Sequence, residues 1–418
     1  MKKNILHFYI LAVVLFAASA FTACSNNDEQ ANGSPVNTYT ITVNATKGDD
    51  ASSAPSNRAL SIVGTTLTAT WTKDDVVAVY KSESNLGNLK AQSDGASTTL
   101  SGTLTGSVDV GDKLTLKFLS PNYTSQEGTL DYIAAHCDYA TATVTVSSIS
   151  DNNITTSPAN FSNQQAIVKF TLKDTGGSSI SASQLVVTAN GTSYTVTPTS
   201  ATSELFVAVP GFSSKNVALT ATVGNDTYTY TKTGVTFENG KYYAVSVKMS
   251  LKTLANATTD DIGKVVDING KIINSTTGAA AMIAYISSPG HGLAIALSDD
   301  ASDSFTDAGK NAAGHTPKVA LGTWRMPSRT DWEHMFTACG ISSDGETSAG
   351  NWTNKGFRDK LTACGADRAD IQTNNPYWTG TDLGNGYAST VYFTTNNACS
   401  FQSASKSESL KVRAVLEF

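Results

Sequence analysis

The clearest strand pattern in the chain is Ala166-Ile167-Val168-Lys169-Phe170-Thr171-Leu172. Its apolar side chains recur at every second position, and a period of two places them on one face of a β-strand. The same alternation appears early in the chain, where Tyr39, Ile41, Val43 and Ala45 are separated by polar residues. Short strands that follow one another with turn residues between them favour β-sandwiches over alternating strand–helix units.

This strand pattern extends over residues 38–250. Further strands are predicted at 67–71, 76–80, 114–118, 144–146, 185–187, 205–209, 217–219 and 242–247. About 200 residues are too many for one small sandwich, and Asp151-Asn152-Asn153 marks a loop. We therefore predict a mainly β fold, with one sandwich at 38–154 and a second at 155–250.

The pattern changes after Met249. Residues 251–257 are predicted to be a linker, and helices are expected among strands beyond it. Ser328 followed by Asp331 resembles a capping box. Two apolar helix faces follow, Trp332, Met335, Phe336 and Cys339 before Gly340, then Phe357, Leu361 and Cys364 before Gly365. This mixture predicts a compact α+β domain over residues 258–418.

The N-terminus carries an export signature. Lys2 and Lys3 precede an apolar stretch, and small residues then lead to Cys24. This order predicts a secretory signal peptide over residues 1–23, and the cysteine after the small residues resembles the lipobox of bacterial lipoproteins. That resemblance implies lipidation of Cys24, and the pair Asp28-Glu29 resembles the signal that exports lipoproteins to the surface of the outer membrane. Residues 24–37, rich in Asn, Ser, Gly and Pro, are predicted to be a flexible tether. The alternative is an ordinary secreted protein with a chance cysteine.

Composition limits the classes of partner. The 418 residues include only 15% charged residues with a net charge of −6, and no basic run or stripe is visible. Nucleic acid is therefore not expected as a partner, and no motif predicts a cofactor, a metal site or a catalytic residue. If Cys24 is lipidated, four cysteines remain, Cys137, Cys339, Cys364 and Cys399. They allow three pairings, and a bridge between Cys339 and Cys364 stays open.

Residues 38–250 resemble the fimbrillin family of Bacteroidetes surface proteins. The residues that carry the resemblance are Asn57-Arg58-Ala59, Trp71 with Asp74-Asp75, Ser120-Pro121-Asn122-Tyr123, the segment 130–140 with Asp138, the strand 166–172 and Gly240-Lys241-Tyr242-Tyr243. The resemblance implies two transthyretin-like sandwiches in a pilus subunit. It also implies protease cleavage at Arg58, removal of the first strand, and its replacement by a strand from another pilus subunit. The alternative is that Arg58 is an ordinary exposed loop residue.

Residues 258–418 resemble domains of the C-type-lectin-like or formylglycine-enzyme-like type. The resemblance is carried by Trp324-Arg325-Met326-Pro327-Ser328, Asp331-Trp332, Tyr377-Trp378-Thr379-Gly380-Thr381 and Val412-Arg413-Ala414-Val415. The sequence lacks the motifs with which calcium-dependent lectins hold sugar; the closest string, Asn374-Asn375-Pro376, has no carboxylate. The resemblance implies a lectin-like fold more than a lectin activity, because sites are grafted onto folds.

Several residues are candidates for ligand binding in this last domain. Tyr and Asn side chains suit adaptable binding loops, which singles out Asp382, Asn385, Tyr387, Asn396 and Asn397. His291 and His315 lie in glycine-rich loops and either converge on a ligand or serve ordinary structural roles. The acidic residues Asp299, Asp300, Asp303 and Asp307 miss the order of a calcium loop and are predicted to form a solvated loop.

These observations favour a non-enzymatic cell-surface lipoprotein. Its expected role is that of a fimbrial or pilus-associated adhesin or accessory subunit at a tip or terminal position, assembled by donor-strand exchange. Its partners would be other pilus subunits and a host or microbial glycan or protein. The alternative is a monomeric glycan-binding surface lipoprotein that does not polymerise.

Overall fold

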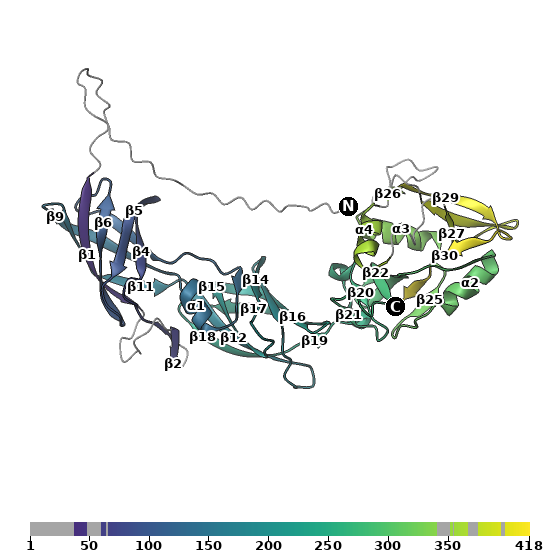
Figure 1. Ribbon diagram of the computed structural model, residues 1–418, viewed down its shortest axis with the longest axis horizontal. Coiled ribbons are helices and arrows are strands. Elements are labelled where there is room, and N and C mark those ends of the chain that lie inside the picture. Colours follow the sequence, from purple (N-terminus) through teal and green to yellow (C-terminus); the bar gives the residue numbers. More distant parts are fainter. Residues whose placement is uncertain are drawn as a thin grey trace, which may run out of the picture.

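The computed structural model describes residues 37–47, 60–63, 66–340, 352–353, 355–366, 375–393 and 398–418. The chain is mainly β, as predicted, and three bodies follow one another along its long axis (Figure 1). Cys24 and Arg58 lie outside the described residues. None of the helices within those ranges is long and apolar enough to cross a membrane.

The first body is one sheet that closes on itself. β1 (Thr38–Lys47) lies between β6 on one side and β10 and β11 on the other. From β11 the sheet continues through β9, β7, β4 and β5 back to β6. The bounds are β4 (Val76–Lys81), β5 (Ser84–Ala91), β6 (Ser97–Thr105), β7 (Lys113–Phe118), β9 (Ala140–Ser150), β10 (Asn153–Thr156) and β11 (Ala159–Asn163). β1 therefore fills the position that completes the ring of strands.

The interior of this body consists of alternate side chains, as the period of two predicts. Tyr39, Ile41, Val43 and Ala45 of β1 are all buried, whereas the residues between them face outward. Trp71 is fully buried and makes edge-to-face contacts with Phe118 and Phe161, at ring-centroid distances of 5.5 and 5.1 Å. The boundary predicted after residue 154 falls inside β10, and the first core extends to Phe161.

The second body has two facing layers. One is β12 (Gln165–Lys173) between β15 (Glu204–Pro210) and β18 (Tyr242–Lys248). The other runs from β14 (Thr192–Val196) through β13 (Gln184–Ala189) and β16 (Phe212–Val223) to β17 (Asp226–Phe237). The strand pattern at 166–172 is confirmed, because the even positions of β12 are buried.

Two excursions from the first half of the chain also enter this second core. They are the hairpin of β2 (Leu60–Val63) and β3 (Thr66–Ala69), and the segment with β8 (Ser125–Gln126) and α1 (Leu130–His136). Leu60, Ala69 and Ile133 pack with the residues of β12 and β15 rather than with those of β1. The first and second bodies are thus interleaved in chain order.

The third body combines sheets and helices. Its first sheet runs β25-β31-β23-β22-β20-β21, and its second runs β24-β30-β27-β28-β29-β26. The strand bounds are β20 (Val265–Val266), β21 (Ile272–Ile273), β22 (Ala281–Ser288), β23 (His291–Ala296), β24 (Asp300–Asp303), β25 (Thr323–Arg325), β26 (Trp352–Thr353), β27 (Pro376–Gly384), β28 (Tyr387–Phe393), β29 (Ala398–Ser405), β30 (Leu410–Val412) and β31 (Val415–Glu417). Helices α2 (Phe305–Gly314), α3 (Arg329–Ala338) and α4 (Lys355–Ala363) pack with these sheets.

The predicted helix signals are confirmed. Ser328 Oγ accepts a hydrogen bond from the Asp331 amide at 3.1 Å, and an Asp331 carboxylate oxygen accepts one from the Ser328 amide at 2.7 Å. The apolar face of α3 and that of α4 are buried in one core. Gly340 and Gly365 have φ angles of 90° and 88°, which a glycine adopts without strain at the end of a helix.

The second and third bodies are joined by backbone pairing. β19 (Ser250–Leu251) pairs with β17, and Asp226 at the start of β17 pairs with Ile273 of β21. Residues 251–257, predicted to be a linker, include the 3-10 turn η1 (Leu254–Asn256), and Leu254 and Ala257 are fully buried in the core of the third body. The connection is therefore packed along this segment.

Candidate functional site

Three places in the described chain have a geometry suited to binding: the slot filled by β1, a groove beside β16 and β17, and a polar cluster under a small cavity in the third body. The slot is the most extensive of these. β1 pairs antiparallel with β6 from Thr38 to Thr46, and parallel with β10 and then β11. All its ladder partners lie far along the sequence, so the covalent link of β1 to the rest of its sheet passes through residues 48–59, which include Arg58.

A buried ion pair lies at the end of this slot. Lys47 is 3% exposed, and its Nζ lies 3.0 Å from Asp138 Oδ2. Gln165 donates a hydrogen bond from Nε2 to Asp138 Oδ1 at 3.1 Å. No motif predicted this pair, although one signal was present in the sequence: the inward register of β1 at 39, 41, 43 and 45 continues to position 47, where a lysine stands.

The groove of the second body is open and polar. It has a volume of ≈ 590 Å³ and is lined by residues of β16, β17 and the segment 248–260, namely Ala218, Leu219, Thr220, Thr229, Tyr230, Thr231, Lys248, Ser250, Lys252, Asn256, Thr258 and Asp260. One aromatic ring among hydroxyl, amide and charged side chains is the kind of surface that binds polar ligands with an apolar face, such as sugars. No sequence motif pointed to this groove.

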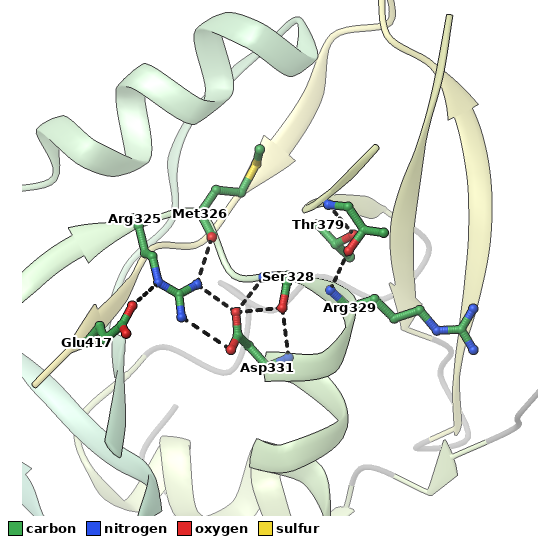
Figure 2. Close-up of polar contacts among 8 residues, drawn as sticks. Arg325, Met326, Ser328, Arg329, Asp331, Thr379 and Glu417 are labelled. Carbon is green, nitrogen blue, oxygen red and sulfur yellow. Dashed lines mark hydrogen bonds and ion pairs between the residues drawn. The ribbon is translucent and has the colours of Figure 1, made fainter. Parts of the chain in front are cut away.

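The polar cluster of the third body is centred on Arg325 of β25. Its guanidinium lies between Asp331 and Glu417, with Nη1 2.6 Å from Asp331 Oδ2 and Nε 2.5 Å from Glu417 Oε2 (Figure 2). The same Asp331 caps α3 together with Ser328, so one carboxylate joins strand β25 to the start of the helix.

Charge pairing sets the ionisation of this cluster. Burial alone would raise the pKa of Asp331, but hydrogen bonds from Arg325 and Ser328 outweigh it and hold that pKa below its usual value. Burial opposes the charge of Arg325, yet its contacts with Asp331 and Glu417 raise the pKa of the guanidinium. A cavity of ≈ 230 Å³ lies against the cluster, with His291 and Tyr285 also in its lining. Because the single positive charge of Arg325 is already paired with two carboxylates, the cluster acts chiefly as a clamp between β25, α3 and β31.

The predicted ligand loop forms the turn between β27 and β28. Asp382 accepts a hydrogen bond from the Gly384 amide at 2.8 Å and pairs with Lys406 at 2.6 Å. Asn385 has a φ of 50°, and Tyr387 is 51% exposed. The loop thus presents one aromatic ring to solvent, while Asn396 and Asn397 lie outside the described residues.

The prediction of a solvated acidic loop is wrong for two of its members. Asp299 accepts hydrogen bonds from Tyr377 Oη at 2.8 Å, Lys411 Nζ at 3.0 Å and Arg413 Nε at 2.6 Å, and Arg413 is fully buried. Asp300 lies 2.8 Å from Nδ1 of His315. The Asp299 carboxylate therefore ties the start of β24 to Lys411 of β30 and to Arg413, and the Asp300 carboxylate ties β24 to His315 at the end of α2. Asp307 keeps the exposed pairing with Lys310 that such a loop would give.

The histidines and cysteines also have structural surroundings. His315 is buried against the ring of Trp324, at a centroid distance of 4.5 Å, whereas His291 is exposed at the start of β23. Cys339 and Cys364 are buried free thiols, so the bridge left open between them is not formed. Burial raises the pKa of Cys339 to about 12 and that of Cys364 to about 11.

Comparisons with known proteins give structural likenesses only. No family model and no curated protein matches the sequence. The chain is similar to a fimbrial protein from Bacteroides ovatus, with 11% identity over 84% of this chain and 95% of that one and a TM-score of 0.26. It is also similar to a fimbrial assembly protein from Parabacteroides distasonis, with 13% identity over 51% and 95% of the two chains and a TM-score of 0.30.

A third similar structure is a tip fimbrial protein from Porphyromonas gingivalis with a C-terminal truncation. The identity is 11%, the match covers 52% of this chain and 98% of that one, and the TM-score is 0.26.

Proposed function

We propose that the chain is a non-enzymatic surface lipoprotein, anchored through Cys24, that works as a pilus-associated adhesin or accessory subunit at a tip or terminal position. The observation that carries the proposal is the placement of β1. It completes the closed sheet through ladders on both edges, and it is joined to the next described strand through the segment that contains Arg58.

Removal of β1 would open a slot with the properties of a strand acceptor. The backbone groups of β6 on one side and of β10 and β11 on the other would lose their ladder partners. The pocket positions of Tyr39, Ile41, Val43 and Ala45 would be exposed at the same time. Unpaired edges and an apolar floor favour the addition of a strand from another subunit.

Cleavage of the exported chain tests this proposal. The chain that starts at Cys24, and its Arg58→Ala variant, are treated with an arginine-specific protease and examined by N-terminal sequencing and size-exclusion chromatography. We expect a cut after Arg58 in the parent chain only, followed by loss of the β1 fragment and assembly or uptake of a donor peptide. An intact bond after Arg58, or a cut product that neither assembles nor takes up a peptide, would overturn the strand-exchange mechanism.

The anchor has its own test. The parent chain and a Cys24→Ala variant are compared for incorporation of labelled fatty acid and for recovery in the outer-membrane fraction. We expect lipid and membrane recovery in the parent alone. Equal recovery without lipid in both would contradict the lipoprotein assignment.

The second candidate function is a monomeric glycan-binding lipoprotein. The polar groove with Tyr230, together with the exposed ring of Tyr387, favours it. The full chain is screened against a glycan panel beside its Tyr230→Ala and Tyr387→Ala variants. Binding that one variant abolishes, from a chain that stays monomeric after protease treatment, would favour this function over the first.

A further inference from the structure

The last inward-facing residue of β1 is a lysine rather than an apolar residue. Positions 39, 41, 43 and 45 hold apolar side chains, and Lys47 follows in the same register. A lysine is rarely buried unless it has a partner, and Lys47, which is 3% exposed, is paired with Asp138. Its backbone is fixed as well, because the Lys47 amide donates to the Ala96 carbonyl at 3.1 Å.

The environment of the Lys47 ammonium group is built from elements other than β1. Its Nζ lies 3.4 Å from the ring centroid of Phe118 and 4.8 Å from that of Trp71, which is the geometry of cation–π contacts. The Asp138 carboxylate lies between α1 and β9 and supplies the opposite charge. Among the described residues, the slot therefore ends in a cation pocket that includes two aromatic faces and the Asp138 carboxylate.

The carboxylate of this pocket needs a cation whenever the slot is filled and dry. Asp138 is 2% exposed, and Gln165 satisfies only one of its two oxygens by a neutral hydrogen bond. A buried charge that loses its partner is strongly destabilising. A strand with an apolar residue at the position of Lys47 would cover Asp138 without neutralising it, so it should bind less well than one with a cation there.

We propose that the slot of the first body selects its strand by charge as well as by apolar pattern. The strand that replaces β1 comes from another protein subunit, runs in the direction of β1, and carries apolar residues at four alternate positions followed two residues later by lysine or arginine. This inference rests on the proposed strand exchange and adds a condition that the donor strand must meet.

Peptide uptake tests the condition. The exported chain, opened by a protease site inserted within residues 48–59, is freed of β1 and offered labelled peptides with the sequence of residues 38–47. The panel contains the parent peptide, Lys47→Arg, Lys47→Met, and Thr42→Met as the matched control, since Thr42 faces outward. Each peptide is offered to the parent protein and to its Asp138→Asn variant, and dissociation constants are measured.

The charge condition predicts a specific set of ratios. On the parent protein the Lys47→Met peptide should bind at least about 10-fold more weakly than the parent peptide, a difference of about 1.4 kcal/mol. The Lys47→Arg and Thr42→Met peptides should stay within about threefold, and the preference for lysine should disappear on Asp138→Asn. Equal binding of the lysine and methionine peptides to the parent protein would overturn the inference.

Failure of strand exchange itself has a different signature. If no peptide binds, the parent included, the proposed assembly mechanism fails. The uncut chain then shows whether the first body requires a cation beside Asp138. Melting temperatures of Lys47→Met, Asp138→Asn and the double variant are compared. The double variant should have a higher melting temperature than the sum of the two single decreases predicts, because it removes both charges together. Strictly additive decreases would show that Lys47 and Asp138 are not coupled and would overturn the charge requirement.

Discussion

The clamp around Arg325 makes the sharpest prediction for the third body, through the substitution Asp331→Asn. The parent carboxylate accepts hydrogen bonds from Arg325 at 2.6 and 3.3 Å and from the Ser328 amide and hydroxyl at 2.7 and 2.8 Å. Asparagine keeps one acceptor oxygen and loses the charge. The substitution therefore weakens the helix cap and the ion pair in one step.

The expected cost follows from these contacts. Loss of a capping interaction costs about 1 kcal/mol, and weakened hydrogen bonds to a charged group cost about 1.5–3 kcal/mol. Together these give about 2.5 kcal/mol at the lower end. Because the Arg325 side chain is 35% exposed and keeps Glu417, solvent screening reduces the expected cost to about 2 kcal/mol. Ser328→Ala is the matched control; it removes the hydroxyl that accepts from the Asp331 amide and donates to the Asp331 carboxylate, leaves the ion pair with Arg325, and should cost about 1 kcal/mol.

The pH dependence provides a second readout. The pKa of Asp331 is lower in the folded protein than in the unfolded chain, so its charge stabilises the fold above the unfolded pKa and the contribution is lost as the pH falls. The difference between parent and Asp331→Asn should be full at pH 6 and should shrink below about pH 4. Urea unfolding is followed by the fluorescence transition of the third body, where Trp324 and Trp332 are buried. Equal midpoints at pH 6, or a difference that does not change down to pH 3, would refute the clamp.

Three further results are expected from the same body. Trp332→Ala should lower the free energy of unfolding by about 3–5 kcal/mol. Trp332→Phe should lower it by under about 1 kcal/mol, because Trp332 Nε1 has no hydrogen-bond partner among the described residues and phenylalanine removes that unsatisfied donor. Equal losses of stability for the two variants in chemical unfolding would contradict this. Cys339 and Cys364, with pKa values raised to about 12 and about 11, should react with a thiol reagent at pH 8 only after unfolding, and rapid labelling of the native chain would be inconsistent with their burial. Tyr387→Ala should change the free energy of unfolding by less than about 0.5 kcal/mol, and so should the control Leu383→Ala, because both side chains are 51% exposed. A larger loss for Tyr387→Ala would show that its ring packs against the domain.

The sequence was sufficient where a local rule decides the structure. Alternation of apolar residues predicted β1 and β12, because the inward side of each strand is almost entirely apolar. The capping box predicted the start of α3, because the side chains of Ser328 and Asp331 each accept a hydrogen bond from the backbone amide of the other within one turn. In these places the partner of each residue lies a few positions away.

The sequence was insufficient where the partner lies far along the chain. No local pattern shows that Leu60 and Ile133 enter the second core instead of the first. Asp299 looked solvated within its acidic run because Arg413, its buried partner, is 114 residues away. Lys47 at an inward position was a readable anomaly, yet only the fold brings it to Asp138.

The packed junction between the second and third bodies has a mechanical consequence. The Lys252 amide donates to the Thr227 carbonyl at 2.8 Å, and the Ile272 amide donates to the Lys252 carbonyl at 3.0 Å. Lys271 also pairs with Asp226 across the junction at 2.8 Å. A pull on the third body would be transmitted into β17 through these bonds in parallel with the chain itself. A load held by several bonds at once resists rupture better than one taken up by a slack tether.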